Sequence, residues 1–266
     1  MSTADFLDAT ALHVAAVAAA VVGGAFALLG IPVPAPAVVL SAAGVFLIYV
    51  VDRAWTRAPE DRANRPARVR WHKRHGWYRW AATTAAFAAI GWAIPSLPGS
   101  AVAAAGVLGA AGLVHVFSGA PKRHPLAKPT AIAAGWGIGA VLFPILLAQP
   151  AAAMILAVLF VRSAAVAANV LLSDIHDTEG DRAESLPSVA GVRGTAAARR
   201  GAQICLLAAA AVALVAFAAW DSPLWGIEAS GLIIFSTTAR WKNTPHPVVL
   251  DLLVGWPAVT WAVFAL

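Results

Sequence analysis

Three aspartates recur at short intervals after a long apolar stretch: Asp174, Asp177 and Asp181. At about 100° per residue of α-helix, their side chains fall within roughly 60° of one another on one helix face. Carboxylates held this close repel one another, and a divalent cation relieves that repulsion. Hard oxygen ligands suit Mg²⁺, which commonly bridges protein carboxylates to the phosphates of a substrate. The spacing therefore favours a magnesium site over the alternative, a solvated acidic loop.

The composition indicates where such a site would lie. The chain has 266 residues, of which 60% are hydrophobic and 12% are charged. Soluble domains carry roughly a quarter of charged residues, so this composition excludes an ordinary cytosolic enzyme, a disordered chain and a nucleic-acid-binding domain. The single Cys205 excludes an intramolecular disulfide. The site is therefore expected at the end of a membrane-embedded helix.

Apolar stretches of about 20 residues are long enough to cross a bilayer as helices. Only helices and closed barrels satisfy their backbone hydrogen bonds in lipid, and the pattern is not that of a barrel. We therefore predict an all-α fold, a polytopic membrane helical bundle of about nine transmembrane helices, in a single domain over 1–266. The predicted spans are Thr10–Leu29, Val33–Val51, Arg79–Ile94, Ala101–Phe117, Ala131–Ala148, Ala151–Leu172, Ala202–Trp220, Leu224–Thr238 and Val248–Leu266.

The basic residues orient these spans. Of the 19 Lys and Arg residues, 17 lie in four loops that each follow an even-numbered span, at about 52–78, 118–130, 173–201 and 239–247, and Arg79 borders the first of these loops. The positive-inside rule makes these loops and the N-terminus cytoplasmic, in an integral protein of the cell inner membrane. Arg162 is the one basic residue within a span, where it is expected to pair with a polar group or to snorkel. Topology explains most of the net charge of +6, so no nucleic-acid partner is predicted.

The acidic run also carries a family resemblance. Asp174-x-x-Asp177-x-x-Gly180-Asp181-Arg182, followed by Leu186-Pro187-Ser188-Val189, resembles the second aspartate-rich motif of the UbiA superfamily of intramembrane prenyltransferases. Nine helices with functional loops after spans two and six are also similar to that family. The resemblance spans nearly the whole chain, and its specificity rests mainly on this one motif.

The first aspartate-rich motif of that family should follow span two. There only Asp52 matches an acidic position of the pattern, whereas Ile48, Tyr49 and Thr56 do not. Glu60 or Asp61 could replace a lost ligand if the loop folds back. Downstream, Asn64-Arg65-Pro66 looks like the Asn-Arg-Pro that often follows this motif in the family.

The resemblance implies a transferase, in the class that moves alkyl or aryl groups other than methyl. It would transfer an isoprenyl group from a prenyl diphosphate to an aromatic or lipid acceptor within the bilayer, with Mg²⁺ as cofactor. The resemblance assigns the metal and catalytic positions to Asp52, Asp174, Asp177 and Asp181, diphosphate binding to Lys122, Lys128 and Arg53, and the cavity lining to Tyr49 and Asn169.

Two other functions stay open on the sequence. The incomplete first motif is compatible with a non-catalytic UbiA-like protein that binds a prenyl lipid. A secondary transporter would explain a repeated bundle, although such proteins bind substrate near the bilayer midplane and these acids cluster at one mouth. His72 and His75 suggest a metal pair or, in the alternative that we favour, histidines at the level of the lipid headgroups.

Overall fold

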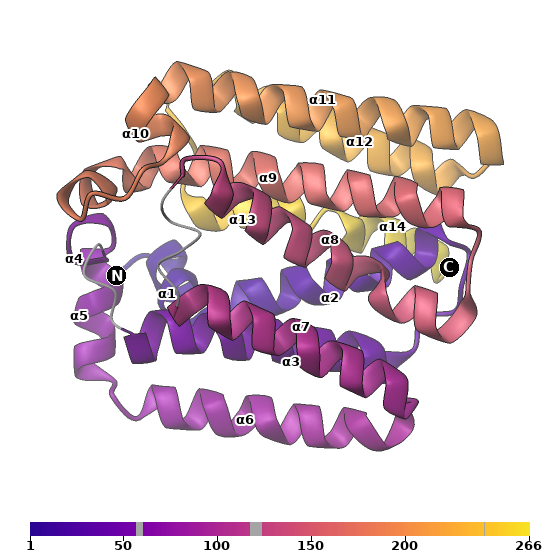
Figure 1. Cartoon of the computed structure of the whole chain (residues 1–266), viewed down its shortest axis with the longest axis horizontal. Helices are drawn as coiled ribbons and strands as arrows, with labels where there is room; N and C mark the ends of the chain where they lie inside the picture. The colour runs from indigo at the N-terminus through magenta and orange to yellow at the C-terminus, as the bar shows by residue number, and fades with distance from the viewer. Residues whose placement is uncertain (57–60, 118–123, 242) are drawn as a thin grey trace.

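The computed structural model describes residues 1–56, 61–117, 124–241 and 243–266 (Figure 1). Every regular element in these ranges is a helix, which confirms the all-α fold class. The longer helices are α2 (Leu12–Leu28), α3 (Ala35–Val50), α6 (Tyr78–Ala93), α7 (Gly99–Phe117), α8 (Ala127–Ala148), α9 (Ala152–Ala183), α11 (Thr195–Trp220) and α12 (Pro223–Thr238). The shorter ones are α1 (Thr3–Thr10), η1 (Val51–Thr56), α4 (Asp61–Asn64), α5 (Pro66–Arg74), η2 (Ile94–Ser96), α10 (Val189–Arg193), α13 (Pro247–Val254) and α14 (Pro257–Phe264).

Local sequence sets several of the helix ends. Pro223, Pro247 and Pro257 each open a helix, where a missing N–H costs nothing and the fixed φ angle suits the first turn. Helices α8 and α11 end at Gln149 and Asp221, whose φ angles of 49° and 47° place them in the left-handed region. These breaks convert one apolar chain into a set of separate helices.

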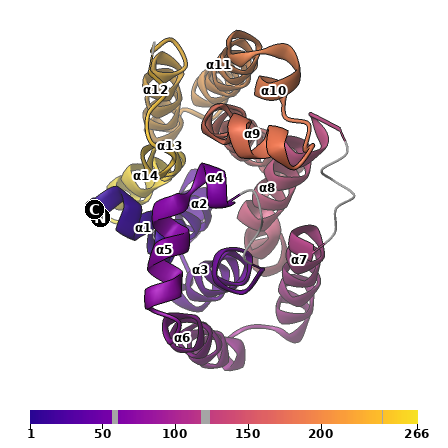
Figure 2. The same cartoon turned by 90° about the vertical axis from the view of Figure 1, so that its left-hand side faces the viewer.

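The long helices pack side by side as a ring when the molecule is viewed from its end (Figure 2). Helix α3 packs on α2, α8 on α7, α9 on α8, α11 on α9 and α12 on α11. Helix α14 contacts both α12 and α2, which joins the last helices to the first. Gly24 permits this closure, because a Cβ there would lie 2.4 Å from the Cβ of Pro257.

Helices occur at all nine predicted span positions, but they differ in length. Within the described ranges, six helical segments are long and apolar enough to cross a membrane, and α1 with α2 makes a seventh if this pair, bent by 73°, counts as one span. Helices α6 and α12 have 16 residues each, about 24 Å, whereas a bilayer core is about 30 Å thick. The apolar helices support an integral membrane protein, and the count of nine full spans is not confirmed.

The predicted cytoplasmic loops contain more helix than the sequence indicated. Helix α9 continues to Ala183 and α11 begins at Thr195, so the acidic run occupies the last turns of α9 rather than a loop. Helices α1, α4, α5 and α10 lie together at one end of the bundle (Figure 1). This end, which we call the loop end, also holds the acidic end of α9.

Candidate functional site

The acidic end of α9 is largely buried. Asp174 and Asp181 are 1% and 6% exposed, and Asp177 is half-buried. Nζ of Lys128, from the start of α8, lies 2.7 Å from Oδ1 of Asp174. The other carboxylate oxygen of Asp174, Oδ2, is buried and has no hydrogen-bond partner among the described residues. The structure thus brings together Lys128 and Asp174, two of the predicted site residues, and leaves one carboxylate oxygen available to a ligand.

The Asn64-Arg65-Pro66 segment lies directly against this acidic end. Oδ1 of Asn64 accepts a hydrogen bond of 2.7 Å from the backbone N–H of Gly180. Nη2 of Arg65 lies 2.7 Å from Oδ1 of Asp177. Two motifs that are more than a hundred residues apart in the sequence therefore form one structure, and α4 covers the carboxylates of α9.

Gly180 makes this contact possible. A Cβ at this position would lie 2.5 Å from the side-chain amide atoms of Asn64, well inside van der Waals contact. Since the amide would have to move away, its hydrogen bond to the Gly180 N–H would be lost.

Gly180→Ala is therefore expected to release the α4–α5 segment from α9 while the helix itself gains propensity. Amide hydrogen exchange over Asn64–Arg74 should become at least about tenfold faster, which corresponds to losing one net hydrogen bond. Gly106→Ala on α7 is the matched control, because a Cβ there meets nothing within 4 Å. Unchanged protection of Asn64–Arg74 in Gly180→Ala would contradict this packing.

The predicted first-motif residues lie on a π-helical continuation of α3, η1, which carries Asp52 and Arg53. Such wide turns are frequent at functional sites. Asp52 lies close enough to Tyr49 and Arg68 to affect their ionisation. In the described parts of the chain, no group of three or more His, Cys, Asp or Glu side chains is arranged to hold a metal ion. Asp52 therefore belongs to the loop end, and the structure does not gather it with the α9 carboxylates into one ready-made cluster.

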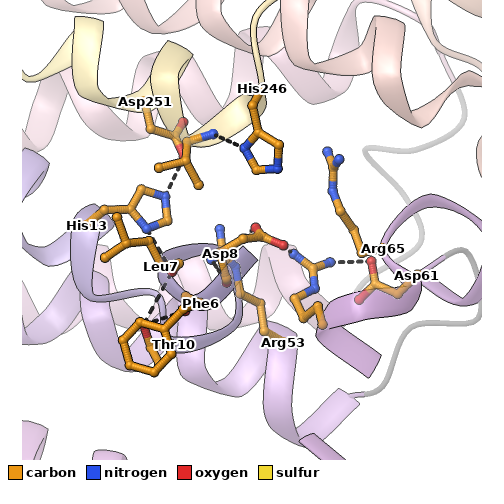
Figure 3. A network of polar contacts seen from close by, with 12 residues as sticks. Phe6, Leu7, Asp8, Thr10, His13, Arg53, Asp61, Arg65, His246 and Asp251 are labelled. Carbon is orange, nitrogen blue, oxygen red and sulfur yellow. Dashed lines mark hydrogen bonds and ion pairs between the residues drawn. The ribbon is translucent and has the colours of Figure 1, made fainter. Parts of the chain in front are cut away.

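Arg53, predicted to bind diphosphate, contacts the N-terminal helix in this structure. Its Nη1 donates to the backbone carbonyl of Asp8 and lies 3.5 Å from Oδ1 of the same residue (Figure 3). Arg68 reaches the same carboxylate at 3.3 Å and also pairs with Asp61. The guanidinium of Arg53 also lies over the ring of Tyr49, 5.1 Å from its centroid. Asp8, which the sequence analysis did not assign to the site, thus holds two buried arginines at the loop end.

The histidines considered as a metal pair have other surroundings. Nδ1 of His75 lies 3.0 Å from the carbonyl oxygen of Trp71, and the two rings stack. Burial, together with the nearby charge of Arg68, lowers the pKa of His72 to about 4. His72 is therefore neutral at pH 7. Both rings pack against Trp71 on or beside α5.

A small cavity of about 30 Å³ lies between α2, α3, α8, α9 and α13. Tyr49 and Asn169, the two residues predicted to line a cavity, both line it, together with Trp136 and Asp251. The other lining residues are aliphatic: Val14, Val17, Ile132, Val166, Val170 and Val254. Asn169 precedes Asp174 by five residues on α9, which is about 7.5 Å along a helix. The acidic end of α9 is therefore one and a half turns from an apolar cavity.

Lys122 and Glu60 lie outside the described residues. Arg162, for which the sequence left two possibilities, pairs with Glu228 of α12: Nη1 donates to Oε1, and Nη2 lies 3.2 Å from Oε2. Thr260 donates to the same Oε2 at 3.1 Å. Arg162 is therefore a buried ion-pair residue within the bundle, and it does not snorkel.

The sequence analysis also missed Asp251 and His13. Each is an ionisable residue inside a predicted span, Thr10–Leu29 or Val248–Leu266, which is the same signal that identified Arg162. Applied to every such residue, that signal would have found Asp251, His13 and Glu228.

No protein-family model matches this sequence, and no curated protein matches it. Solved structures do match. The apo structure of a UbiA homologue from Aeropyrum pernix K1 has a TM-score of 0.69 at 18% identity, over 97% of this chain and 99% of that chain. A UbiA homologue from Archaeoglobus fulgidus has a TM-score of 0.67 at 13% identity, over 98% of this chain and 100% of that chain. A structure of a UbiA homologue from Archaeoglobus fulgidus bound to GPP and Mg²⁺ has a TM-score of 0.65 at 13% identity, with the same coverage.

At identities this low, the comparison shows a shared fold, and the structural similarity extends over nearly the full length of each chain. The helical bundle described above, with its acidic helix end covered by the Asn-Arg-Pro segment, therefore has the fold of the UbiA homologues.

Proposed function

We propose that this chain is a member of the UbiA superfamily and a magnesium-dependent prenyltransferase. It moves an isoprenyl group from a prenyl diphosphate to an aromatic or other hydrophobic acceptor. One observation carries the proposal: the buried carboxylates of Asp174 and Asp181 lie at the end of a helix whose preceding turns line an apolar cavity. Structures of UbiA homologues from Archaeoglobus fulgidus bound to Mg²⁺ with GPP or with DMAPP support the same chemistry here.

The donor chemistry of the α9 carboxylates suits a magnesium ion, although the described residues do not form a ready-made cluster. Oδ2 of Asp174 is buried and has no hydrogen-bond partner in the described part of the chain, and Asp177 and Asp181 follow on the same helix. Their carboxylate oxygens are the hard ligands that Mg²⁺ prefers. Asp174, Asp177 and Asp181 would hold the ion, with Asp52 as the fourth proposed ligand from η1. When bound, Mg²⁺ supplies positive charge that neutralises the diphosphate.

The basic residues of the loop end act on the same phosphate oxygens. Lys128, whose side chain is 32% exposed, has a flexible stem and can turn its ammonium from Asp174 to an incoming diphosphate as a point charge. Arg53 lies over Tyr49 at the border between the loop end and the cavity. We assign these two residues, with Lys122, to diphosphate binding. The aliphatic cavity excludes water, which would otherwise consume a reactive prenyl cation.

The same proposal includes an orientation in the membrane. Because the short helices α1, α4, α5 and α10 share one end of the bundle (Figure 1) and α5 is rich in basic residues, the positive-inside rule favours a cytoplasmic position for that end and for the N-terminus. A prenyl diphosphate made in the cytoplasm or held in the membrane would then meet the acidic end of α9 directly. We propose an inner-membrane protein in which 1–266 form one UbiA-like domain.

Turnover tests the proposal. Purified protein in detergent is incubated with Mg²⁺, with GPP or DMAPP, and with a panel of aromatic and lipid acceptors, while release of diphosphate is followed. We expect release that depends on both Mg²⁺ and an acceptor. If no combination of donor and acceptor gives release above that of protein-free samples, the assignment is wrong.

A second function is favoured by a specific observation. Lys128 and Arg65 pair with Asp174 and Asp177, so two of the carboxylates already have cationic partners. A protein that binds prenyl diphosphate without turning it over would retain such pairs. Binding of GPP without release of diphosphate would identify this function.

A further inference from the structure

A chain of hydrogen bonds runs along one wall of the cavity and does not take part in the diphosphate site. Asn169 donates through Nδ2 to Oδ1 of Asp251 at 2.8 Å, and Ser173 donates through Oγ to Oδ1 of Asn169 at 3.0 Å. Oδ2 of Asp251 lies 2.9 Å from Nε2 of His13 (Figure 3). Both oxygens of Asp251 are therefore fixed by side chains from α9 and α2.

The proton positions follow from the partners of His13. Nδ1 of His13 lies 3.0 Å from the carbonyl oxygen of Leu7. A carbonyl only accepts, so Nδ1 carries a proton. Nε2 and Oδ2 of Asp251 share one further proton across 2.9 Å, so the two side chains together carry no net charge, and the carboxyl group is the end of the pair that lines the cavity. The side chain of His13 is 1% exposed and that of Asp251 is 26% exposed. Asp251 lines the cavity, and its Oδ2 contacts the imidazole ring of His13.

The rest of the cavity wall also favours a positive guest. Two aromatic residues, Tyr49 and Trp136, line it, and the remaining residues that line it are Asn169 and aliphatic side chains. Aromatic rings attract cations through their faces. Among the described residues lining this cavity, Asp251 is the one charged side chain. A carboxylate and two aromatic rings in an otherwise apolar space form a site for a cation.

The depth of this site matches the reaction proposed above. Asn169, which holds Asp251, precedes Asp174 by about 7.5 Å along α9. A prenyl diphosphate anchored by its phosphates at Asp174, with its chain pointing along α9 toward the cavity, would place the carbon bonded to the diphosphate between these two levels. Positive charge develops on that carbon when its bond to oxygen breaks.

We propose that Asp251, held by His13 and Asn169, stabilises the allylic cation formed during prenyl transfer. This inference rests on the proposed function. The C–O bond of the donor breaks and its electron pair leaves with the diphosphate. An electron pair of the acceptor then forms the new bond to the same carbon, and the acceptor releases a proton to water. Asp251 forms no covalent bond, and its carboxylate lowers the energy of the cation because it faces the cavity, with His13 on its buried side, and is preorganised there.

The test compares a prenyl cation with its neutral counterpart. Geranylamine, which is protonated at pH 7, and geraniol are titrated into the protein with Mg²⁺ and inorganic diphosphate. Wild-type protein is expected to bind the ammonium at least about tenfold more tightly than the alcohol, a modest preference for a desolvated cation facing a carboxylate and aromatic rings. Asp251→Asn keeps the size of the side chain and an oxygen that can accept the hydrogen bond from Asn169. It should reduce that preference to less than about twofold. Asp221→Asn, at the end of α11, is the control that keeps the preference.

These binding measurements test the cation site at Asp251 without measuring turnover. Absence of an ammonium preference in the wild type, or its retention in Asp251→Asn, overturns the inference. If Asp251→Asn fails to fold, Asp251→Ser is used in its place. The comparison of the two ligands on the wild-type protein does not depend on either variant. A wild-type protein that prefers the ammonium but releases no diphosphate from GPP would refute the proposed function and still establish the cation site, so the two failures are distinguishable.

Discussion

Asp174→Asn is expected to slow diphosphate release about 1,000-fold, a loss of about 4 kcal/mol of transition-state stabilisation. Asp174 is 1% exposed, and it presents one carboxylate oxygen to Lys128 and the other to no hydrogen-bond partner in the described structure. The asparagine keeps the size but removes the negative charge that would hold a divalent cation. The measurement is the single-turnover rate of diphosphate release at saturating GPP and Mg²⁺.

Two comparisons make this result interpretable. Asp221→Asn lies on the left-handed end of α11, where asparagine is also tolerated, and should keep the wild-type rate. Elution of Asp174→Asn as a monodisperse species would show that the fold survives loss of the ion pair with Lys128. A folded Asp174→Asn protein with a rate within tenfold of the wild type would remove this aspartate from the site.

The second large effect concerns stability. Glu228→Gln should destabilise the protein by about 3–5 kcal/mol, because it leaves Arg162 charged and without its counter-ion in a buried position. Arg162 and Glu228 are 2% and 1% exposed, and Nε of Arg162 already has no hydrogen-bond partner among the described residues. A loss of this size would lower the midpoint of thermal unfolding in detergent by about 6 °C or more for a chain of this length.

The matched control removes both charges. The double variant Arg162→Met with Glu228→Met leaves no buried charge, and such replacements are often neutral or stabilising. Its unfolding midpoint should therefore lie at or above that of the wild type. Equal midpoints for Glu228→Gln and the wild type would show that Arg162 is not held by this pair.

The acidic helix end was predictable because its information is local. The spacing of Asp174, Asp177 and Asp181 alone places them on one helix face, and the structure continues α9 through all three. The role of Gly180 was not predictable in the same way. It depends on Asn64, which lies 116 positions away in the sequence, and a single sequence carries no record of such a contact.

The partners of Arg53 show a second limit. Its predicted role follows from its position beside Asp52, but its observed contact is Asp8, which reaches it because α1 is bent by 73° relative to α2. That bend occurs at Ala11, whose φ of 58° is unusual for alanine and is not indicated by its residue type. The pairing of Asp251 with His13 was not predictable for another reason: each residue is isolated in its own helix, and the pair exists only once α13 packs on α2.

The central claim is that the acidic end of α9 binds a prenyl diphosphate through Mg²⁺. Calorimetric titration of GPP into the purified protein, with Mg²⁺ and with excess chelator, tests it most directly. We expect tight binding of GPP only with Mg²⁺, and loss of that binding in the double variant Asp174→Asn with Asp177→Asn. Binding of GPP that is unchanged by the chelator, or by the double variant, would contradict it.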